Sequence, residues 1–195
     1  SWSGFDYIGE PTPYHTRNSY FGQIDTAGFP KDSYYLYQAA WIDRREKPVV
    51  HVFPYWDFNP GQLIDVRIAS NADVVELLVN GVSKGRQRIN HTGESKLTGD
   101  YRIAYEKGEI TAVAYDENLK EIARETRSSF GEPVRLILTQ YEPERTLFAG
   151  TGDMAFFTVV AVDEADHPVE NANNRIEVSV EGAGWLTGLD NGDSR

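Results

Sequence analysis

The 195-residue sequence contains no cysteine, which excludes disulfide bonds, thiolate metal sites and a cysteine nucleophile. It also contains no apolar run near the roughly 20 residues that a membrane helix needs, and no basic-then-apolar signal segment. We therefore expect no membrane partner. The chain begins on an apolar stretch without a start methionine, so the missing signal segment says nothing about export and leaves the localisation open.

Basic residues are few relative to acidic ones, with 19 Lys and Arg against 30 Asp and Glu and a net charge of −11. This balance repels phosphate backbones, so we expect no nucleic-acid partner. It is also a common solubility device. Hydrophobic residues make up 40% and charged residues 25%, which is ordinary for a globular protein.

The first eight residues are strongly apolar, with Trp2, Phe5, Tyr7 and Ile8 close together. This pattern predicts a buried strand that turns sharply at Gly9. A strand of this kind needs neighbours on both faces, as in a parallel sheet. No preceding sequence supplies them, so we expect the chain to be a piece of a longer protein.

One helix is predicted, over Lys31–Trp41. Pro30 is placed as a helix-start residue, and Asp32 suits the positive end of the helix dipole. Tyr34, Tyr37, Gln38 and Trp41 fall on one stripe at helical spacing. We expect the aromatic side chains of this stripe to pack on the first sandwich or on another chain. The opening strand, its turn and this helix make one β/α unit across residues 1–45.

Residues 46–129 change to short β-rich runs separated by polar turns. Asn80-Gly81 between two such runs predicts a hairpin, because both turn positions need a positive φ. Residues 106–109 predict a second hairpin, and residues 116–118 a turn into the last strand. Short strands at close, regular spacing favour an immunoglobulin-like antiparallel sandwich.

Residues 130–195 continue in the same style, with strands predicted at 134–140, 155–163 and 175–180. Three or four strands are too few for a sandwich of about seven. We therefore expect either a truncated second sandwich or a half-domain that leans on the first. Residues 190–193 have some of the side chains of a calcium loop but lack its twelve-residue pattern, so we predict a Gly-containing turn there.

The sequence resembles family-two glycoside hydrolases of the β-galactosidase group. The resemblance is carried by residues 2–14, 28–32 and 34–38, which look like the last strand, loop and helix of the (β/α)8 catalytic barrel. It continues through residues 50–54, 75–81 and 108–116, which look like the sandwich after the barrel, and 190–193, which look like part of a later one. The implied fold is mainly β, with two immunoglobulin-like sandwiches preceded by a remnant β/α unit.

The resemblance implies retaining hydrolysis of terminal β-galactosides or related β-glycosides. That chemistry uses two glutamates about 5 Å apart and no cofactor. In the family both lie on earlier barrel strands, and Glu10 matches neither, so we expect the chain alone to be inactive. The implied partners are the carbohydrate substrate of the intact parent and the remainder of the barrel, with homo-oligomer contacts left open.

Trp2 and Asp6 are the two candidate substrate-binding residues. The resemblance places Trp2 under the sugar, where a flat indole packs on the C–H face of a pyranose; the alternative is a frayed terminal aromatic. Asp6 either orients the site and binds sugar hydroxyls, or caps the turn at residues 11–13. No catalytic residue is assigned, and the four histidines lack metal-ligand spacing, so no metal site is predicted.

A rival interpretation is a non-catalytic carbohydrate-binding or structural module. It rests on Tyr55, Trp56 and Phe58, which lie between two prolines and could form a sugar-stacking loop. The same residues could equally form the seam where the sandwich meets the barrel, which the resemblance favours.

Overall fold

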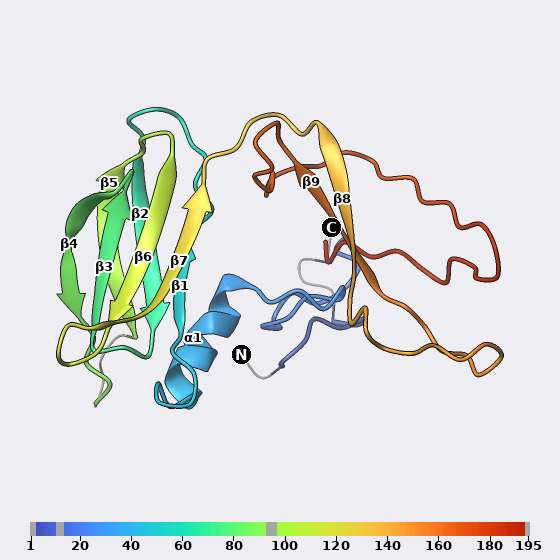
Figure 1. The fold of residues 1–195 in the computed structure, drawn as a ribbon, viewed down its shortest axis with the longest axis horizontal. Helices are drawn as coiled ribbons and strands as arrows, with labels where there is room; N and C mark the ends of the chain where they lie inside the picture. Colours follow the sequence, from blue (N-terminus) through green and yellow to red (C-terminus); the bar gives the residue numbers. More distant parts are fainter. Residues whose placement is uncertain (1–2, 11–13, 93–96, 194–195) are drawn as a thin grey trace.

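The structure is a computed structural model that describes residues 3–10, 14–92 and 97–193. These residues are mainly β, with one helix among them (Figure 1). The elements in chain order are α1 (Asp32–Trp41), β1 (Val50–Phe53), β2 (Leu63–Ser70), β3 (Val74–Val79), β4 (Val82–Arg88), β5 (Thr98–Ala104), β6 (Glu109–Tyr115), β7 (Glu121–Ser128), β8 (Arg135–Gln140) and β9 (Phe157–Val162). No helix among the described residues is long and apolar enough to cross a membrane.

β1 to β7 form the predicted antiparallel sandwich (Figure 1). One sheet has the strand order β1-β2-β5 and the other β4-β3-β6-β7. β2 shows the expected period of two, with Ile64, Val66 and Ile68 buried and the residues between them exposed. These side chains meet Leu77 and Ile110 of the other sheet in one core.

Of the two predicted hairpins, the first is confirmed and the second is wrong. Asn80 and Gly81 join β3 to β4 with φ of 51° and 78°. Residues 105–108 instead carry the chain from one sheet to the other, because β5 pairs with β2 whereas β6 pairs with β3 and β7. At this crossing the side chain of Tyr105 is buried in the core, and β5 and β6 do not pair with each other.

α1 begins and ends within one residue of its predicted bounds and lies against β1 and β2. The predicted packing of the aromatic stripe on the sandwich does not hold for Trp41, and packing on another chain stays a prediction. Trp41 is 77% exposed and its ring lies 4.9 Å from that of Tyr37, on the helix itself. Ala39 is the buried residue of α1, and the half-buried ring of Tyr35 stacks on His51 of β1.

The opening section, dark blue in Figure 1, lies on the far side of α1 from the two sheets. The sharp turn after Ile8 is present, with positive φ at Gly9 and Glu10. The predicted buried strand is not formed across residues 3–8, where Phe5 and Ile8 are exposed and a single parallel bridge joins Phe5 to Ile24. The described chain offers no second neighbour for such a strand, so the barrel remnant stays a prediction.

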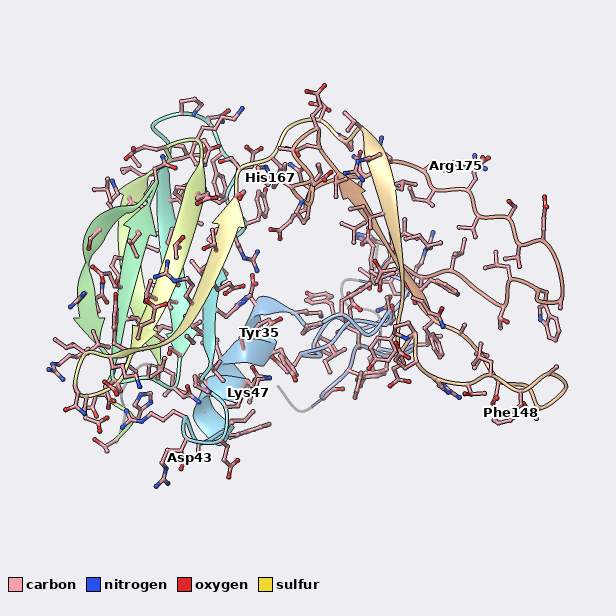
Figure 2. The ribbon with its side chains drawn as sticks, viewed as in Figure 1. Tyr35, Asp43, Lys47, Phe148, His167 and Arg175 are labelled. Carbon is pink, nitrogen blue, oxygen red and sulfur yellow. The ribbon has the colours of Figure 1, made fainter. Side chains whose placement is uncertain are left out.

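After the sandwich the chain forms the antiparallel pair β8–β9, which confirms two of the three strands predicted there. Residues 175–180 were predicted as the third and form no strand, because no other segment pairs with them. The long connection between β8 and β9 carries Phe148 at its far end (Figure 2). At residues 190–193, where a Gly-containing turn is predicted, the backbone forms no regular turn; Gly192 has a φ of 73° and its N–H donates to Oδ1 of Asp190.

Candidate functional site

The segment with the two candidate binding residues is tied to residues 19–24 by backbone hydrogen bonds. The carbonyl of Gly4 accepts from the N–H groups of Gln23 and Ile24, both at 3.0 Å. The N–H of Asp6 donates to the carbonyl of Ile24 at 2.8 Å. Trp2 lies outside the described residues, so its predicted role stays a prediction. The residues that follow it in the chain are nevertheless held in a defined path.

Asp6 is the centre of this arrangement. Its carboxylate oxygens lie 2.8 and 2.7 Å from Nζ of Lys31, and Oδ1 also accepts the N–H of Gly22 at 2.8 Å. Nζ of Lys31 donates further to the carbonyl of Tyr20 at 3.2 Å. A buried carboxylate needs such partners, because desolvation is otherwise costly. The contacts show that Asp6 joins the opening segment to Gly22 and Lys31, while its predicted roles at a sugar site and at the turn of residues 11–13 stay predictions.

Gly22 explains how closely the two segments approach. A Cβ placed on Gly22 would lie 2.2 Å from backbone atoms of both Phe5 and Asp6. Real Cβ atoms do not come this close, so any other residue here would push the segments apart. No local sequence pattern predicts this contact, because it joins Asp6 and Gly22, which are 16 residues apart in the chain.

A second buried group, His51, joins the helix to the sandwich and was not singled out from the sequence. Its Nε2 lies 2.9 Å from Oδ1 of Asp32 and its Nδ1 lies 3.2 Å from Oε1 of Glu125. Burial opposes protonation, but the hydrogen bonds with the two carboxylates outweigh it and raise the pKa of His51. A signal was available, since His51 interrupts an otherwise apolar strand of four residues.

Beside His51 is a cavity of about 440 Å³ between the start of α1, β1 and β7. Its charged side chains are partnered: Arg127 donates to Glu170 at 2.9 Å, Asp32 bonds His51, and Lys31 pairs with Asp6 outside the cavity. The lining residues are Pro30, Lys31, Asp32, Tyr35, His51, Pro54, Tyr55, Arg127 and Glu170. Among the described residues no group of three or more His, Asp or Glu side chains could hold a metal ion.

The aromatic loop after β1 is a packing seam in this structure. Trp56 is fully buried, its Nε1 donates to the carbonyl of Glu106 at 3.1 Å, and its ring packs edge-on against Tyr105. Tyr55 stacks on Phe58 and also contacts Phe130, where the chain leaves the sandwich. The indole of Trp56 therefore offers no face to a sugar, which removes the main support for the binding-module interpretation.

Comparison with known proteins identifies the family. Residues 140–195 match the model of the glycoside hydrolase family 2 C-terminal domain 5, and residues 61–123 match a domain of unknown function, DUF4982. Over 196 residues the sequence is 42% identical to the β-galactosidase BoGH2A of Bacteroides ovatus, covering 98% of this chain and 22% of that protein. The chain belongs to the C-terminal region of family 2 glycoside hydrolases.

Two further glycosidases are similar to this chain. A β-glucuronidase of Formosa agariphila is 29% identical over 174 residues, covering 88% of this chain and 17% of its own length. The crystal structure of a β-glycosidase from Bacteroides vulgatus superposes with a TM-score of 0.76 at 31% identity, covering 86% of this chain and 20% of that one. The 195-residue chain therefore spans about a fifth of the length of these relatives.

Proposed function

We propose that this chain is the C-terminal part of a retaining β-glycosidase that hydrolyses terminal β-galactosides or related β-glycosides in carbohydrate metabolism. The observation that carries the proposal is the 42% identity to a β-galactosidase over 98% of the chain, which includes the opening section. Similarity to a β-glucuronidase is weaker, and it is the reason that the proposal includes related glycosides.

Within that enzyme we assign three parts to the chain. Residues 1–45 supply the end of the catalytic barrel, residues 46–129 the first sandwich and residues 130–195 the second. Trp2 would form an aromatic wall under the sugar, because carbohydrate faces pack on indole rings and barrel sites lie at the carboxyl ends of strands. The sandwiches would buttress the barrel and perform no reaction.

The described residues support the proposed inactivity of the chain alone. Retaining hydrolysis needs two carboxyl groups about 5 Å apart, one of them a nucleophile. In the cavity beside α1 both acidic side chains are already ion-paired, Asp32 with His51 and Glu170 with Arg127. The two carboxylates within residues 3–10 are also engaged, since Asp6 binds Lys31 and Glu10 accepts from Tyr7.

The experiment compares the purified 195-residue chain with the full-length parent on nitrophenyl β-galactoside and β-glucuronide. We expect turnover by the parent on one of them, release of the β-anomer first in an NMR time course, and no turnover by the chain. Activity of the chain that survives further purification would overturn the proposed inactivity. A parent that cleaves neither glycoside, nor a wider panel of β-glycosides, would overturn the proposed function.

Two tryptophan variants of the parent test the site assignment. Trp2→Ala should lower kcat/KM by about 10-fold or more, because a stacked aromatic face contributes about 0.5–1.5 kcal/mol beyond the area that it buries. Trp41→Ala is the matched control, because this indole is 77% exposed and its ring contacts Tyr37 of the same helix. Equal effects of the two variants would contradict the role of Trp2.

A further inference from the structure

We propose that Lys31 is a positioning residue, which holds the segment that carries Trp2 in register with the sandwich by way of Asp6. The inference rests on the proposed function, because it concerns the sugar site assigned there. It assigns no direct contact between Lys31 and substrate. Its basis is a set of contacts that runs without interruption from the sandwich to the opening segment.

The first part of this set is the pair Lys31 and Asp6. The Asp6 side chain is 2% exposed and that of Lys31 is 31% exposed, so the ion pair is largely shielded from water. Shielded pairs are screened less by salt than surface pairs, and loss of one partner leaves the other charge buried. Lys31 is thus the counter-charge on which the path of the opening segment depends.

The second part is the position of Lys31 directly before α1. Its N–H donates to the carbonyl of Gln23 at 2.9 Å, and its own carbonyl accepts the N–H of Tyr34 in the first helical turn. The side chain of Lys31 reaches the opening segment, while the side chain of the next residue, Asp32, reaches His51 on the sandwich. Two consecutive residues therefore bond to the two parts of the molecule that flank the helix.

The third part is the anchoring of Asp32 by the sandwich. His51, on β1, bonds both Asp32 and Glu125 of β7, and Glu125 also accepts the N–H of Val52 at 2.7 Å. The sandwich thus fixes Asp32, the helix start fixes Lys31, and Lys31 fixes Asp6. Through these contacts the sandwich, to which we assign no catalytic residue, sets the position of the opening segment. Position matters here because a misplacement of about 1 Å in an active site can lower the rate about 100-fold.

The chemistry of lysine suits this task. Its ammonium group is a compact charge with three donors on a flexible stem. Nζ uses them on the two carboxylate oxygens of Asp6 and the carbonyl of Tyr20. Lys31→Met keeps the length and apolar stem while it removes the charge and the donors, and Lys31→Arg keeps the charge in a different shape.

The test uses the full-length parent in a double-mutant cycle with Trp2. We expect Lys31→Met to lower kcat/KM by about 10-fold or more. Lys31→Arg should recover part of this loss. The control Lys84→Met should change kcat/KM by less than about twofold. Lys84 is a matched control, because its Nζ pairs with Glu106 at 3.0 Å on the sandwich. In a Trp2→Ala background the cost of Lys31→Met should shrink to less than about twofold, since the residue that it positions is absent.

Amide hydrogen exchange on the same variants gives a second measurement that needs no activity. Lys31→Met should speed exchange at the N–H groups of Asp6 and Ile24 and leave β3 unchanged. Unchanged exchange at Asp6 and Ile24, or an equal cost of Lys31→Met with and without Trp2, would overturn the inference. A parent that cleaves no β-glycoside but shows the exchange effect would instead overturn the proposed function and leave the coupling standing.

Discussion

The imidazole ring of His51 stacks on the phenol ring of Tyr35, with centroids 3.7 Å apart and planes inclined by 16°. Tyr35 belongs to α1 and His51 to β1, so this contact joins the helix to the sandwich. The same imidazole bonds Asp32 on the helix and Glu125 on β7. Burial raises the pKa of Tyr35, and the nearby carboxylate of Glu125 raises it further. His51 therefore attaches the helix to the sandwich in two ways, by ring stacking on Tyr35 and by a hydrogen bond with Asp32.

The stability of this attachment should depend on pH. The raised pKa means that the folded state binds the His51 proton more tightly than the unfolded chain, where histidine titrates near about 6.5. The contribution of His51 is then complete below pH about 6.5 and is lost as the pH rises through the folded-state pKa. Denaturant unfolding at a series of pH values should show this loss, and His51→Gln should remove it. His15→Gln, at an exposed position, is the control; an unchanged pH profile in His51→Gln would contradict the assignment.

Glu76 should give the opposite pH dependence. Burial opposes its ionisation, but hydrogen bonds from Ser83, Tyr115 and Arg86 outweigh burial and lower the pKa of Glu76. Its contribution to stability is present above the unfolded-state pKa, about 4.3, and is lost as the pH falls through the folded-state value. We expect Glu76→Gln to cost about 1–3 kcal/mol at pH 7 and progressively less in acid, by urea unfolding. Glu46→Gln, at an exposed site, should show no such trend.

Gly22→Ala should loosen the opening section. The added methyl group would meet backbone atoms of Phe5 and Asp6 at 2.2 Å, so the segments must separate. Overpacking of this kind costs about 1–3 kcal/mol. Amide exchange at Asp6 should rise, whereas Gly188→Ala, where a Cβ meets nothing within 4 Å, should change nothing. Normal protection of Asp6 in Gly22→Ala would show that the close approach is absent in solution.

Leu77→Ala should destabilise the sandwich. Leu77 is fully buried in the core between the two sheets, and loss of its side chain leaves a cavity. Such substitutions cost about 2–5 kcal/mol. Leu63→Ala is the matched control in β2, because this leucine is 60% exposed. Thermal unfolding should separate the two variants clearly; equal melting temperatures would refute the placement of Leu77 in the core.

The sequence was informative wherever local chemistry determines structure. The Asn80-Gly81 turn, the alternation along β2 and the acidic first helical turn at Asp32 each act over a few residues, and each is found. Pro30, predicted as a helix-start residue, instead lies before the N-cap Lys31 and forms a bridge with Ile24. It misled where partners are distant. Residues 106–109 have turn chemistry that suits both a hairpin and a crossing, and only the buried ring of Tyr105 and the pairing of β5 with β2 decide between them.

In the candidate site, too, the contacts that the sequence does not predict are those between residues far apart in the chain. Asp6 was recognised as a special carboxylate, but its partner Lys31 lies 25 residues away, and no spacing argument joins the two. Apolar composition predicted a buried strand at residues 3–8, yet burial requires neighbours that the described chain does not provide. For Trp56 the sequence leaves two alternatives, a sugar-stacking loop and a packing seam, and the complete burial of the indole excludes the first.

The contrast between Trp56 and two other indoles gives the molecule its own optical reporters. Trp56 is sealed inside the sandwich, while Trp41 and Trp185 are open to solvent. Iodide, a quencher that stays in water, should therefore quench the fluorescence of Trp41 and Trp185 and should not quench that of Trp56 until the sandwich unfolds. In a Trp2→Phe variant, which removes the fourth tryptophan of the sequence, emission that remains in iodide would then report unfolding of the sandwich without any attached dye.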